Sequence, residues 1–591
     1  MHKIDKMQKI APKKTLDRDL IYRILLVIIV FIVMSPAMNN NFINWDDEPY
    51  ITKNEVVKKA PFSNLEEIFT HKINNFSVPL TLLSFQIEYY FFGLNPFPYH
   101  FNNLLLHLLN VVLMYFFIRK LVVSPTETSQ TTAFFVALLF GIHPMNVESV
   151  AWATERKDLL YTFFALLTLL QYVYIIENQS AKILSQLKSK HYWLSILFFV
   201  LSLLSKPQAI FLPALLLLID YWKQPEGKNV IWSVLSPSKL FSKFPYFIIS
   251  FLAGLYLLLN VGTKVYEKSI DYTFFEKFLF SCYQIGLYLV KFFFPFQLSN
   301  FYEYPTKSGS FYPMIFYITP FVLIGLLSWL FWKFRTNKAV IFGLLFYFAN
   351  IFIFLQVFSV NTGIAYERFN YLAYNGLFFI VVIFLQRITL TDLGKLGLFA
   401  YLLLFGVLSF QRCKIWQNDI VFFADMARKN PNNVDANKIA IKNMADELME
   451  KNQIPAAIEK FTQAMGKDIN YEQAYLGRAY AYFISKRYAE AILDYNKALT
   501  LGIRPDERNQ VIFNRGTCFM NLQNYPQAIT DFNALISIAP NYVSAYLNRA
   551  FCFGKSGDYE RAIADYQTVL QIEPTNAIAV QQLGLIRGNM K

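Results

Sequence analysis

The chain has 591 residues, of which 55% are hydrophobic and only 16% are charged. Several apolar runs approach the roughly 20 residues that a helix needs to cross the hydrocarbon core of a bilayer, which excludes a wholly soluble protein and indicates a multi-pass membrane protein. The formal net charge of +14 does not indicate nucleic-acid binding, because much of it lies in short loops between apolar runs, where Lys and Arg set the topology.

The N-terminal segment 1–20 is basic and precedes an apolar run at 21–38 that is long enough to span the membrane. We therefore expect a retained signal anchor with a cytoplasmic N-terminus and no cleavage. Further spans are predicted downstream, which makes about eleven in total. They lie at 101–120, 131–148, 159–177, 192–205, 209–222, 245–261, 312–332, 339–358, 371–387 and 396–411.

One apolar run, 274–296, is not counted as a span. Lys277 and Lys291 interrupt its apolar character, and counting it would place a later basic segment, 332–338, outside and invert the loops that follow. We expect this run to lie at the outer interface or to re-enter the membrane. The basic loops then all face the cytoplasm, and the chain after residue 411 lies outside.

Five unusual polar segments fall together on the outer side of this topology. Ionisable groups at membrane edges are costly, and they usually face a cavity and mark a substrate path. We therefore predict a polar pocket at the outer leaflet, beside the first outer loop, 39–100. The segments are "NWDDEPY" (44–50), "GIHPMNVESVAWATERKDLL" (141–160), "LLSKPQAIF" (203–211), "FPFQLSNFYEYP" (294–305) and "GIAYERFNYLAYN" (363–375).

The residue types in this pocket suit a phosphorylated ligand. Arg368, Arg156 and Lys206 are candidates for binding a lipid phosphate, because guanidinium and ammonium groups bind phosphate oxygens. Asp46 or Asp47 is a candidate general base; the alternative is that the two carboxylates hold a divalent cation, Mg²⁺ or Mn²⁺. No other cofactor or metal site is indicated. Supporting positions are assigned to Glu148, His143, Glu367 and Tyr371.

These residues also have purely structural interpretations. Asp46 and Asp47 occur in a sequence typical of a solvated turn, and Lys206 is typical of a snorkelling anchor at a span end. His107, in the middle of a predicted span, is typical of an interhelical hydrogen-bond partner. Candidate structural ion pairs are Glu148 with Arg156 and Glu367 with Arg368.

The C-terminal part, 438–591, shows a repeated pattern typical of tetratricopeptide (TPR) units, each a pair of antiparallel helices. Arg478, Arg515 and Arg549 mark equivalent positions, and small and aromatic residues recur at helical spacing after each. With a weaker unit before them, we predict about four repeats plus a capping helix, joined to the membrane region by a connector at 412–437. Such a solenoid has a concave groove suited to a peptide or protein segment.

Taken together, these stretches resemble the transmembrane and TPR repeat-containing (TMTC-type) O-mannosyltransferases and their bacterial relatives, in the GT-C glycosyltransferase superfamily. The resemblance implies an all-α fold: a GT-C-like membrane bundle over 21–411, followed by a TPR α-solenoid. It is carried by the acidic pair at 46–47, "HPMNVESVAWATERKDLL", the segment around residue 206, "PFQLSNFYEYP", "AYERFNYL" and "QRCKIWQND".

The resemblance implies transfer of a sugar, typically mannose, from a polyprenyl- or dolichyl-phosphate carrier to Ser or Thr hydroxyls on the non-cytoplasmic side. Asp46 or Asp47 would be the catalytic base, while Arg368, with Arg156 and Lys206, would hold the carrier phosphate. An acceptor protein or peptide would bind the TPR groove. This sequence departs from the animal relatives at Pro207, where they have an acidic residue, and in its shorter repeat array, which leaves the acceptor and the sugar open.

Other functions fit the same sequence. One is a non-catalytic scaffold, in which the membrane part only anchors TPR repeats that assemble an envelope complex. Another is a transferase or ligase that acts on a glycolipid or glycan. A transporter ranks last, because the ionisable groups lie at one edge and not near the midplane. The compact repeat array favours a bacterial inner membrane with a periplasmic TPR domain; in a eukaryote the site would be the endoplasmic reticulum.

Overall fold

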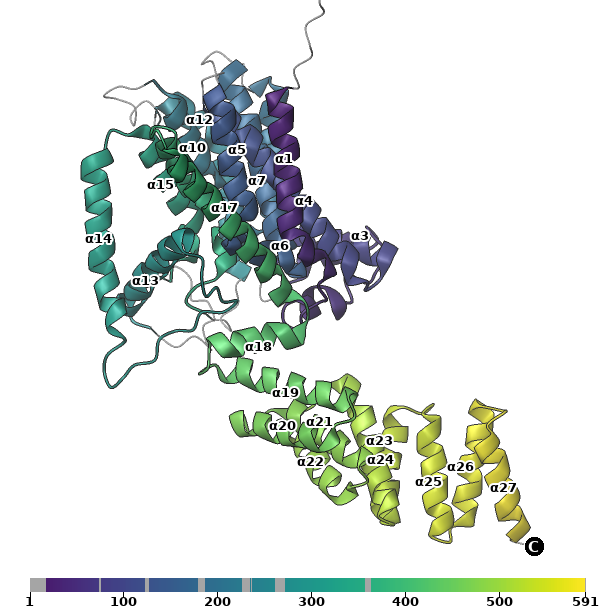
Figure 1. The fold of residues 1–591 in the computed structure, drawn as a ribbon. Coiled ribbons are helices and arrows are strands. Elements are labelled where there is room, and N and C mark those ends of the chain that lie inside the picture. The colour runs from purple at the N-terminus through teal and green to yellow at the C-terminus, as the bar shows by residue number, and fades with distance from the viewer. Residues whose placement is uncertain are drawn as a thin grey trace, which may run out of the picture. The chain divides into compact units, whose positions relative to one another are not determined.

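The computed structural model describes residues 17–73, 76–122, 127–178, 187–225, 234, 236–260, 272–356 and 363–589. The chain forms two compact units, 1–422 and 423–591 (Figure 1). Helices make up the regular structure of these ranges, and the extended pairings described within them are three isolated bridges: Ile73 with Phe76, Tyr302 with Ala365, and Ser308 with Phe311. The protein is therefore all-α, as predicted. The predicted cytoplasmic tail up to residue 16 and the ends of two predicted spans, 261 and 357–358, lie outside the described residues.

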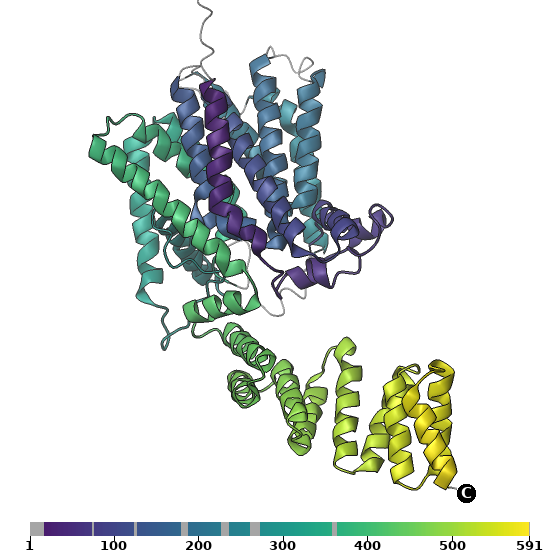
Figure 2. The same ribbon diagram turned by 45° about the vertical axis from the view of Figure 1, so that its right-hand side comes forward.

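The first unit is a bundle of long apolar helices, in which α1 packs against α4, α5 and α17 (Figure 2). The helices are α1 (Arg18–Met34), α2 (Leu65–Thr70), α3 (Pro79–Phe92), α4 (Pro96–Leu121), α5 (Glu127–Ile142), α6 (Val147–Ala151), α7 (Arg156–Asn178), α9 (Lys190–Ser205), α10 (Leu212–Lys223), α12 (Pro237–Asn260), α13 (Phe274–Phe293), α14 (Met314–Phe334), α15 (Lys338–Ile351), α16 (Tyr374–Leu385) and α17 (Asp392–Cys413).

Six helices of the described chain are long and apolar enough to cross a membrane. A bent pair, Ser129–Ile142 with Pro144–Ala151, would be a seventh; its two parts meet at 57°, beside a proline whose missing N–H cannot continue the helix. Helix α13 is not among these candidates, and three apolar helices are shorter. The count of eleven spans stays a prediction. The six are Arg18–Asn39, Pro96–Leu121, Ala153–Glu177, Lys239–Leu259, Met314–Phe334 and Asp392–Trp416.

Basic residues gather at one end of the bundle. At the start of α1, Asp19 lies 2.5 Å from an Arg119 nitrogen and 2.5 Å from the Tyr115 hydroxyl, both near the end of α4. At the end of α7, Glu177 binds Lys120 at 3.0 Å and Lys223 at 3.1 Å. Because α7 has 23 residues, this end lies about 35 Å along the helix axis from the end that begins at residue 156. The predicted outer segments lie around that opposite end.

The second unit consists of four consecutive helix pairs and a final helix, as the repeat pattern predicts (Figure 2). Small residues let the paired helices approach closely: a Cβ on Gly516 of the 505–521 helix would lie 2.9 Å from the ring of Phe532 in the helix that follows. Helix α18 (Asp419–Lys429) begins in the first unit and ends in the second. The repeats are α19 (Val434–Glu450), α20 (Ile454–Lys467), α21 (Glu472–Ile484), α22 (Tyr488–Leu501), α23 (Pro505–Asn521), α24 (Tyr525–Ile538), α25 (Val543–Lys555), α26 (Tyr559–Ile572) and α27 (Ala577–Asn589).

Candidate functional site

The acidic pair follows α1 in a turn that is anchored by Asp47. One carboxylate oxygen of Asp47 accepts the backbone N–H of Ile43 at 2.7 Å, and the other accepts the backbone N–H of Thr154 at 3.1 Å. The side chain is buried, and burial raises its pKa to about 7, although these hydrogen bonds act in the opposite direction. Both oxygens are thus used to dock the turn onto the start of the 153–177 helix. Asp47 is a structural anchor in this geometry.

Asp46, its neighbour, has a different environment. Its side chain is only partly buried, and it lies within electrostatic range of Arg368 and Lys157. An accessible carboxylate between two cations is suited to take up a proton from a hydroxyl that is brought to it. Of the two acids that the sequence left equivalent, Asp46 therefore has the better placement for a base.

Arg368 lies in a pocket of acids and aromatic rings. Its Nη1 is 2.5 Å from a Glu148 oxygen, its backbone N–H donates to the same carboxylate at 3.1 Å, and its Nε is 3.4 Å from Glu155. The guanidinium also lies 4.2 Å from the ring centre of Tyr366 and 5.5 Å from that of Trp152. Burial lowers the pKa of Arg368, but Glu155 and Glu148 outweigh that effect and raise it, so the group stays charged.

Lys157 is a functional candidate that the sequence analysis did not single out. Its ammonium is 3.0 Å from a Glu155 oxygen and lies over the rings of Tyr50, at 4.7 Å, and Trp152, at 5.9 Å. Tyr50 belongs to the turn 41–50 that carries Asp46 and Asp47, called the acid loop from here on, so Lys157 lies between that loop and the acids and rings around Arg368. The only sequence signal was its place beside Arg156, and helix periodicity alone could not tell which of the two faces the loop.

Arg156 points elsewhere. Its guanidinium lies 2.5 Å from Glu88 on α3, donates to the Asn103 side chain at 2.8 Å and to the Tyr99 carbonyl at 2.6 Å, and lies over the ring of Phe85. The side chain is 2% exposed. These contacts brace α3 and α4 against α7, and they leave little of the guanidinium for a phosphate. This placement differs from the predicted phosphate contact.

Lys206 is also paired, with Asp158 in the first turn of α7. Its side chain is 12% exposed, and its ammonium lies over the ring of Phe354. The three candidate phosphate-binding cations, Arg368, Arg156 and Lys206, therefore all have carboxylate partners. Both side-chain polar atoms of Asn370 nevertheless remain without a hydrogen-bond partner in the described part of this region.

Of the four predicted supporting residues, Glu148 contacts Arg368, whereas His143, Glu367 and Tyr371 hold other parts of the unit together. Glu148 belongs to the pocket through Arg368. His143 is buried, accepts the Met145 N–H at 3.2 Å and lies 3.1 Å from the Phe292 carbonyl, which holds the bend after α5. Tyr371 lies 2.6 Å from a nitrogen of His107, whose other nitrogen is 3.0 Å from the Gly141 carbonyl. The interhelical role predicted for His107 is confirmed.

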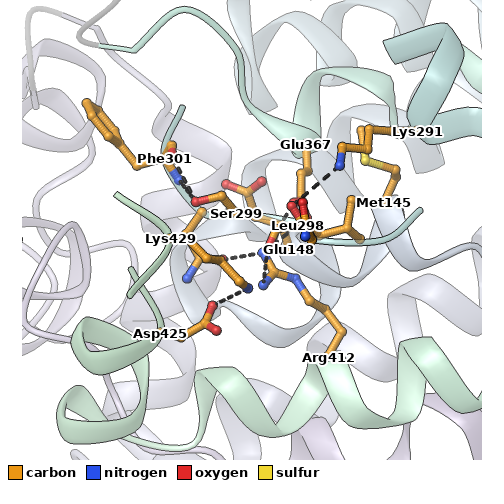
Figure 3. Close-up of polar contacts among 12 residues, drawn as sticks. Met145, Glu148, Lys291, Leu298, Ser299, Phe301, Glu367, Arg412, Asp425 and Lys429 are labelled. Carbon is orange, nitrogen blue, oxygen red and sulfur yellow. Dashed lines mark hydrogen bonds and ion pairs between the residues drawn. The ribbon is translucent and has the colours of Figure 1, made fainter. Parts of the chain in front are cut away.

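Glu367 faces away from the Arg368 pocket. Its carboxylate oxygens lie 3.2 and 3.3 Å from Nη2 of Arg412, at the end of α17, and Tyr302 donates to it at 3.2 Å. Arg412 also donates to the Leu298 carbonyl at 3.0 Å, and Figure 3 shows its guanidinium directed toward Glu367 and Leu298. The adjacent residues 367 and 368 thus bind two different parts of the unit.

Asp46 and Asp47 are the predicted ligands for a divalent cation, if one is bound. Within the described ranges, no group of three or more His, Cys, Asp or Glu side chains is arranged to hold a metal ion. Asp47 already uses both oxygens on backbone donors. Asp46 is therefore the more accessible carboxylate for Mg²⁺ or Mn²⁺, ions that bind through one or two carboxylates together with water and phosphate oxygens.

Comparison with sequence families identifies tetratricopeptide repeats in the second unit. The description "Tetratricopeptide repeat" matches residues 442–507, 510–542 and 543–576. The C-terminal unit is therefore a TPR array, as the sequence predicted.

Similarity to curated proteins is partial. The chain is 36% identical over 94 residues to "Protein O-mannosyl-transferase TMTC1" of Mus musculus, which covers 16% of this chain and 10% of that protein. It is 26% identical over 200 residues to "Protein O-mannosyl-transferase TMTC4" of Homo sapiens, which covers 31% and 27%. The chain thus spans about a tenth of the length of the first relative and about a quarter of the second. The apolar helices and the TPR repeats indicate a membrane protein with a repeat unit, and part of its sequence is similar to the TMTC proteins.

Two solved structures have a partial likeness to this chain. MamA from Desulfovibrio magneticus RS-1 is 16% identical, with a TM-score of 0.25, and covers 26% of this chain and 85% of its own. The Arabidopsis OM64 TPR domain is 25% identical, with a TM-score of 0.19, and covers 20% and 94%.

Proposed function

We propose that the first unit transfers a sugar, in the first instance mannose, from a polyprenyl- or dolichyl-phosphate carrier to a Ser or Thr hydroxyl of a protein. The observation that carries the proposal is the docking of the acid loop, through Asp47, beside Lys157 and Arg368. It brings an accessible carboxylate and two cations from segments far apart in the sequence to one place. The partial similarity to the TMTC proteins agrees with this chemistry.

The reaction requires one proton acceptor and stabilisation of one leaving group. The acceptor hydroxyl oxygen bonds to the sugar C1 while the bond from C1 to the carrier phosphate oxygen breaks. Asp46 takes the hydroxyl proton, and the carrier phosphate leaves with the bonding electron pair. Arg368 and Lys157 stabilise the negative charge that develops on that phosphate.

Donor capacity remains on both cations despite their acidic partners. In the described structure, Arg368 uses Nη1 on Glu148 and Nε on Glu155, and Nη2 has no bonded acceptor. The 3.4 Å contact with Glu155 is longer than the 2.5 Å contact with Glu148, so a phosphate displaces Glu155 more easily. The carboxylates thus hold the cations in place until the carrier phosphate arrives.

The site is proposed to face the non-cytoplasmic side, in a bacterial inner membrane or, in a eukaryote, the endoplasmic reticulum. Basic residues cluster at the opposite end of the bundle, around Lys120 and Lys223, and such residues favour the cytoplasm. The TPR unit is proposed to bind the acceptor protein.

The proposal is tested by Asp46→Asn in the purified full-length protein, with dolichyl-phosphate mannose and a Ser/Thr-rich peptide. General-base catalysis contributes about 10²- to 10⁴-fold, so we expect kcat to fall at least about 100-fold. Asp392→Asn is the control, because that acid is 98% exposed at the far end of α17. Full activity in Asp46→Asn contradicts the role of Asp46. Hexose found on a lipid or glycan and not on the peptide would move the assignment to glycolipid transfer.

A further inference from the structure

Residues 416–422, which follow α17, make a second set of contacts with the acid loop. One Asp419 carboxylate oxygen accepts the backbone N–H of Asn44 at 2.7 Å, and the other contacts the Asn44 side-chain amide. The backbone N–H of Asn41 donates to the Gln417 carbonyl at 2.9 Å. Asn44 and Asp419 lie 375 residues apart in the chain. The turn that carries Asp46 is therefore held from the α7 side by Asp47 and from the other side by Asp419.

Aromatic rings of the segment 416–422 pack against the acid loop and against the ring that contacts Arg368 and Lys157. Trp416 is fully buried and stacks on Trp152, with the ring centres 5.1 Å apart. Trp152 in turn lies 5.5 Å from the Arg368 guanidinium and 5.9 Å from the Lys157 ammonium. Phe422 packs edge-on against Trp45, at 5.8 Å. One short segment, 416–422, thus contacts both the residue before Asp46 and the ring on which the cations rest.

We infer that Asp419 is a positioning residue for Asp46, and that Trp416 is one for the two cations. This inference rests on the proposed transfer reaction and extends it to residues of the segment "QRCKIWQND", to which the resemblance assigned no role. A general base must lie within hydrogen-bond reach of the proton that it takes, and a displacement of about 1 Å lowers the rate about 100-fold. The two bonds from Asp419 to Asn44 set where the turn, and with it Asp46, lies.

The Asn44–Asp419 pair offers an exchange experiment. In Asp419→Asn, the Asn44 amide must rotate to present its oxygen to the new amide donor, and the backbone N–H of Asn44 then binds a neutral oxygen, which weakens both bonds. In Asn44→Asp, two carboxylates face each other. In the double variant, the amide oxygen at position 419 accepts the backbone N–H of position 44, and the amide nitrogen at position 419 donates to the carboxylate at position 44, so both bonds are restored. We expect Asn44→Asp to lower kcat about tenfold or more, Asp419→Asn to lower it by less, and the double variant to recover most of the loss. The KM for dolichyl-phosphate mannose should stay unchanged, because the cations are not altered.

Amide hydrogen exchange of the peptide 41–50 gives a readout that does not depend on activity. We expect faster exchange in each single variant and wild-type exchange in the double variant, with Asp392→Asn unchanged. If both single variants keep wild-type kcat and exchange, or if the double variant shows only the summed losses, the positioning role is refuted. If Asp46→Asn is active but the exchange pattern follows the pair, the positioning of the turn stands and the proposed reaction is refuted.

Trp416 is tested by conservative replacement. Trp416→Phe keeps an aromatic ring against Trp152, whereas Trp416→Leu removes the stack. We expect Trp416→Leu to raise the KM for the carrier while Trp416→Phe keeps it near wild type, at equal expression and equal thermal midpoint. An equal KM in the two variants refutes the role of the ring.

Discussion

The arginines of the two units are paired in different ways. In the TPR unit, Arg478, Arg515 and Arg549 each bind, with two nitrogens, the Asp that lies 16 residues later, at distances from 2.5 to 2.8 Å. Each pair joins the two helices of one repeat, and the pattern recurs without change. These pairs belong to the repeat itself, and they serve its architecture.

In the membrane unit, the partners come from distant segments. Arg368 binds Glu148, 220 residues away, and Arg412 binds Glu367, 45 residues away. Around Arg368 the charges are also shared among several partners, because Glu155 lies 3.0 Å from Lys157 and 3.4 Å from Arg368. A cluster of charges drawn together from distant segments is therefore a better indicator of a functional site than charges alone.

The largest expected effect is a loss of stability in a variant of Arg156, whose guanidinium, like those of the repeat arginines, is bound by protein acceptors. Arg156→Met leaves Glu88 buried without its cation, which costs about 3–5 kcal/mol of stability. The thermal midpoint of the detergent-solubilised protein should fall strongly, and Glu88→Gln added to Arg156→Met should recover part of the loss. Lys395→Met, in an exposed pair with Asp392, is the control, with an expected loss below about 1 kcal/mol. A normal midpoint in Arg156→Met with loss of carrier binding would return Arg156 to the phosphate site.

The second effect is a pH dependence that comes from Asp47. Its pKa is about 7 in the folded protein and 3.8 in its ordinary state, so between these values the folded protein holds a proton that the unfolded chain has released. The free energy of unfolding should therefore decrease as pH rises from 4 to 7, by about 1.4 kcal/mol per pH unit. The difference in thermal midpoint between wild type and Asp47→Asn, measured at pH 5, 6 and 7, reports this term. A constant difference would show that Asp47 does not titrate in this range.

The smallest expected effect is a rise in the KM for the lipid carrier, which should occur in a variant of Arg368 but not in a variant of a repeat arginine. Arg368→Lys keeps the charge but loses the planar fork that binds two oxygens at once. We expect the KM for the lipid carrier to rise about tenfold, or about 1.4 kcal/mol. The matched control is Arg515→Lys, which should leave that KM unchanged, because Arg515 binds Asp531 within its own repeat. Equal KM values in the two variants would remove the distinction between the units.

Local patterns in the sequence predicted the local structure well. The repeat period and its small residues predicted the helix pairs of the TPR unit, because each pair packs within 34 or so residues of its own sequence. His107 was correctly assigned to an interhelical contact, since a histidine in the middle of an apolar run has few other ways to satisfy its nitrogens.

The charge pairing could not be predicted in the same way. Sequence proximity suggested Glu148 with Arg156 and Glu367 with Arg368, whereas the structure pairs Glu148 with Arg368 and gives the other two charges more distant partners. No sequence pattern distinguished Asp46 from Asp47, and none marked Lys157 as a site residue. Which carboxylate docks and which stays accessible depends on the backbone N–H of Thr154, more than a hundred residues further along.

By itself, the sequence determined that this protein is a helical membrane protein with a C-terminal TPR array, because apolar run length and repeat period are read along the chain. Only the tertiary structure decided which of its many charged residues meet at the acid loop. The physical reason is that an ion pair is set by distance in space, and the packing of helices far apart in the chain sets that distance.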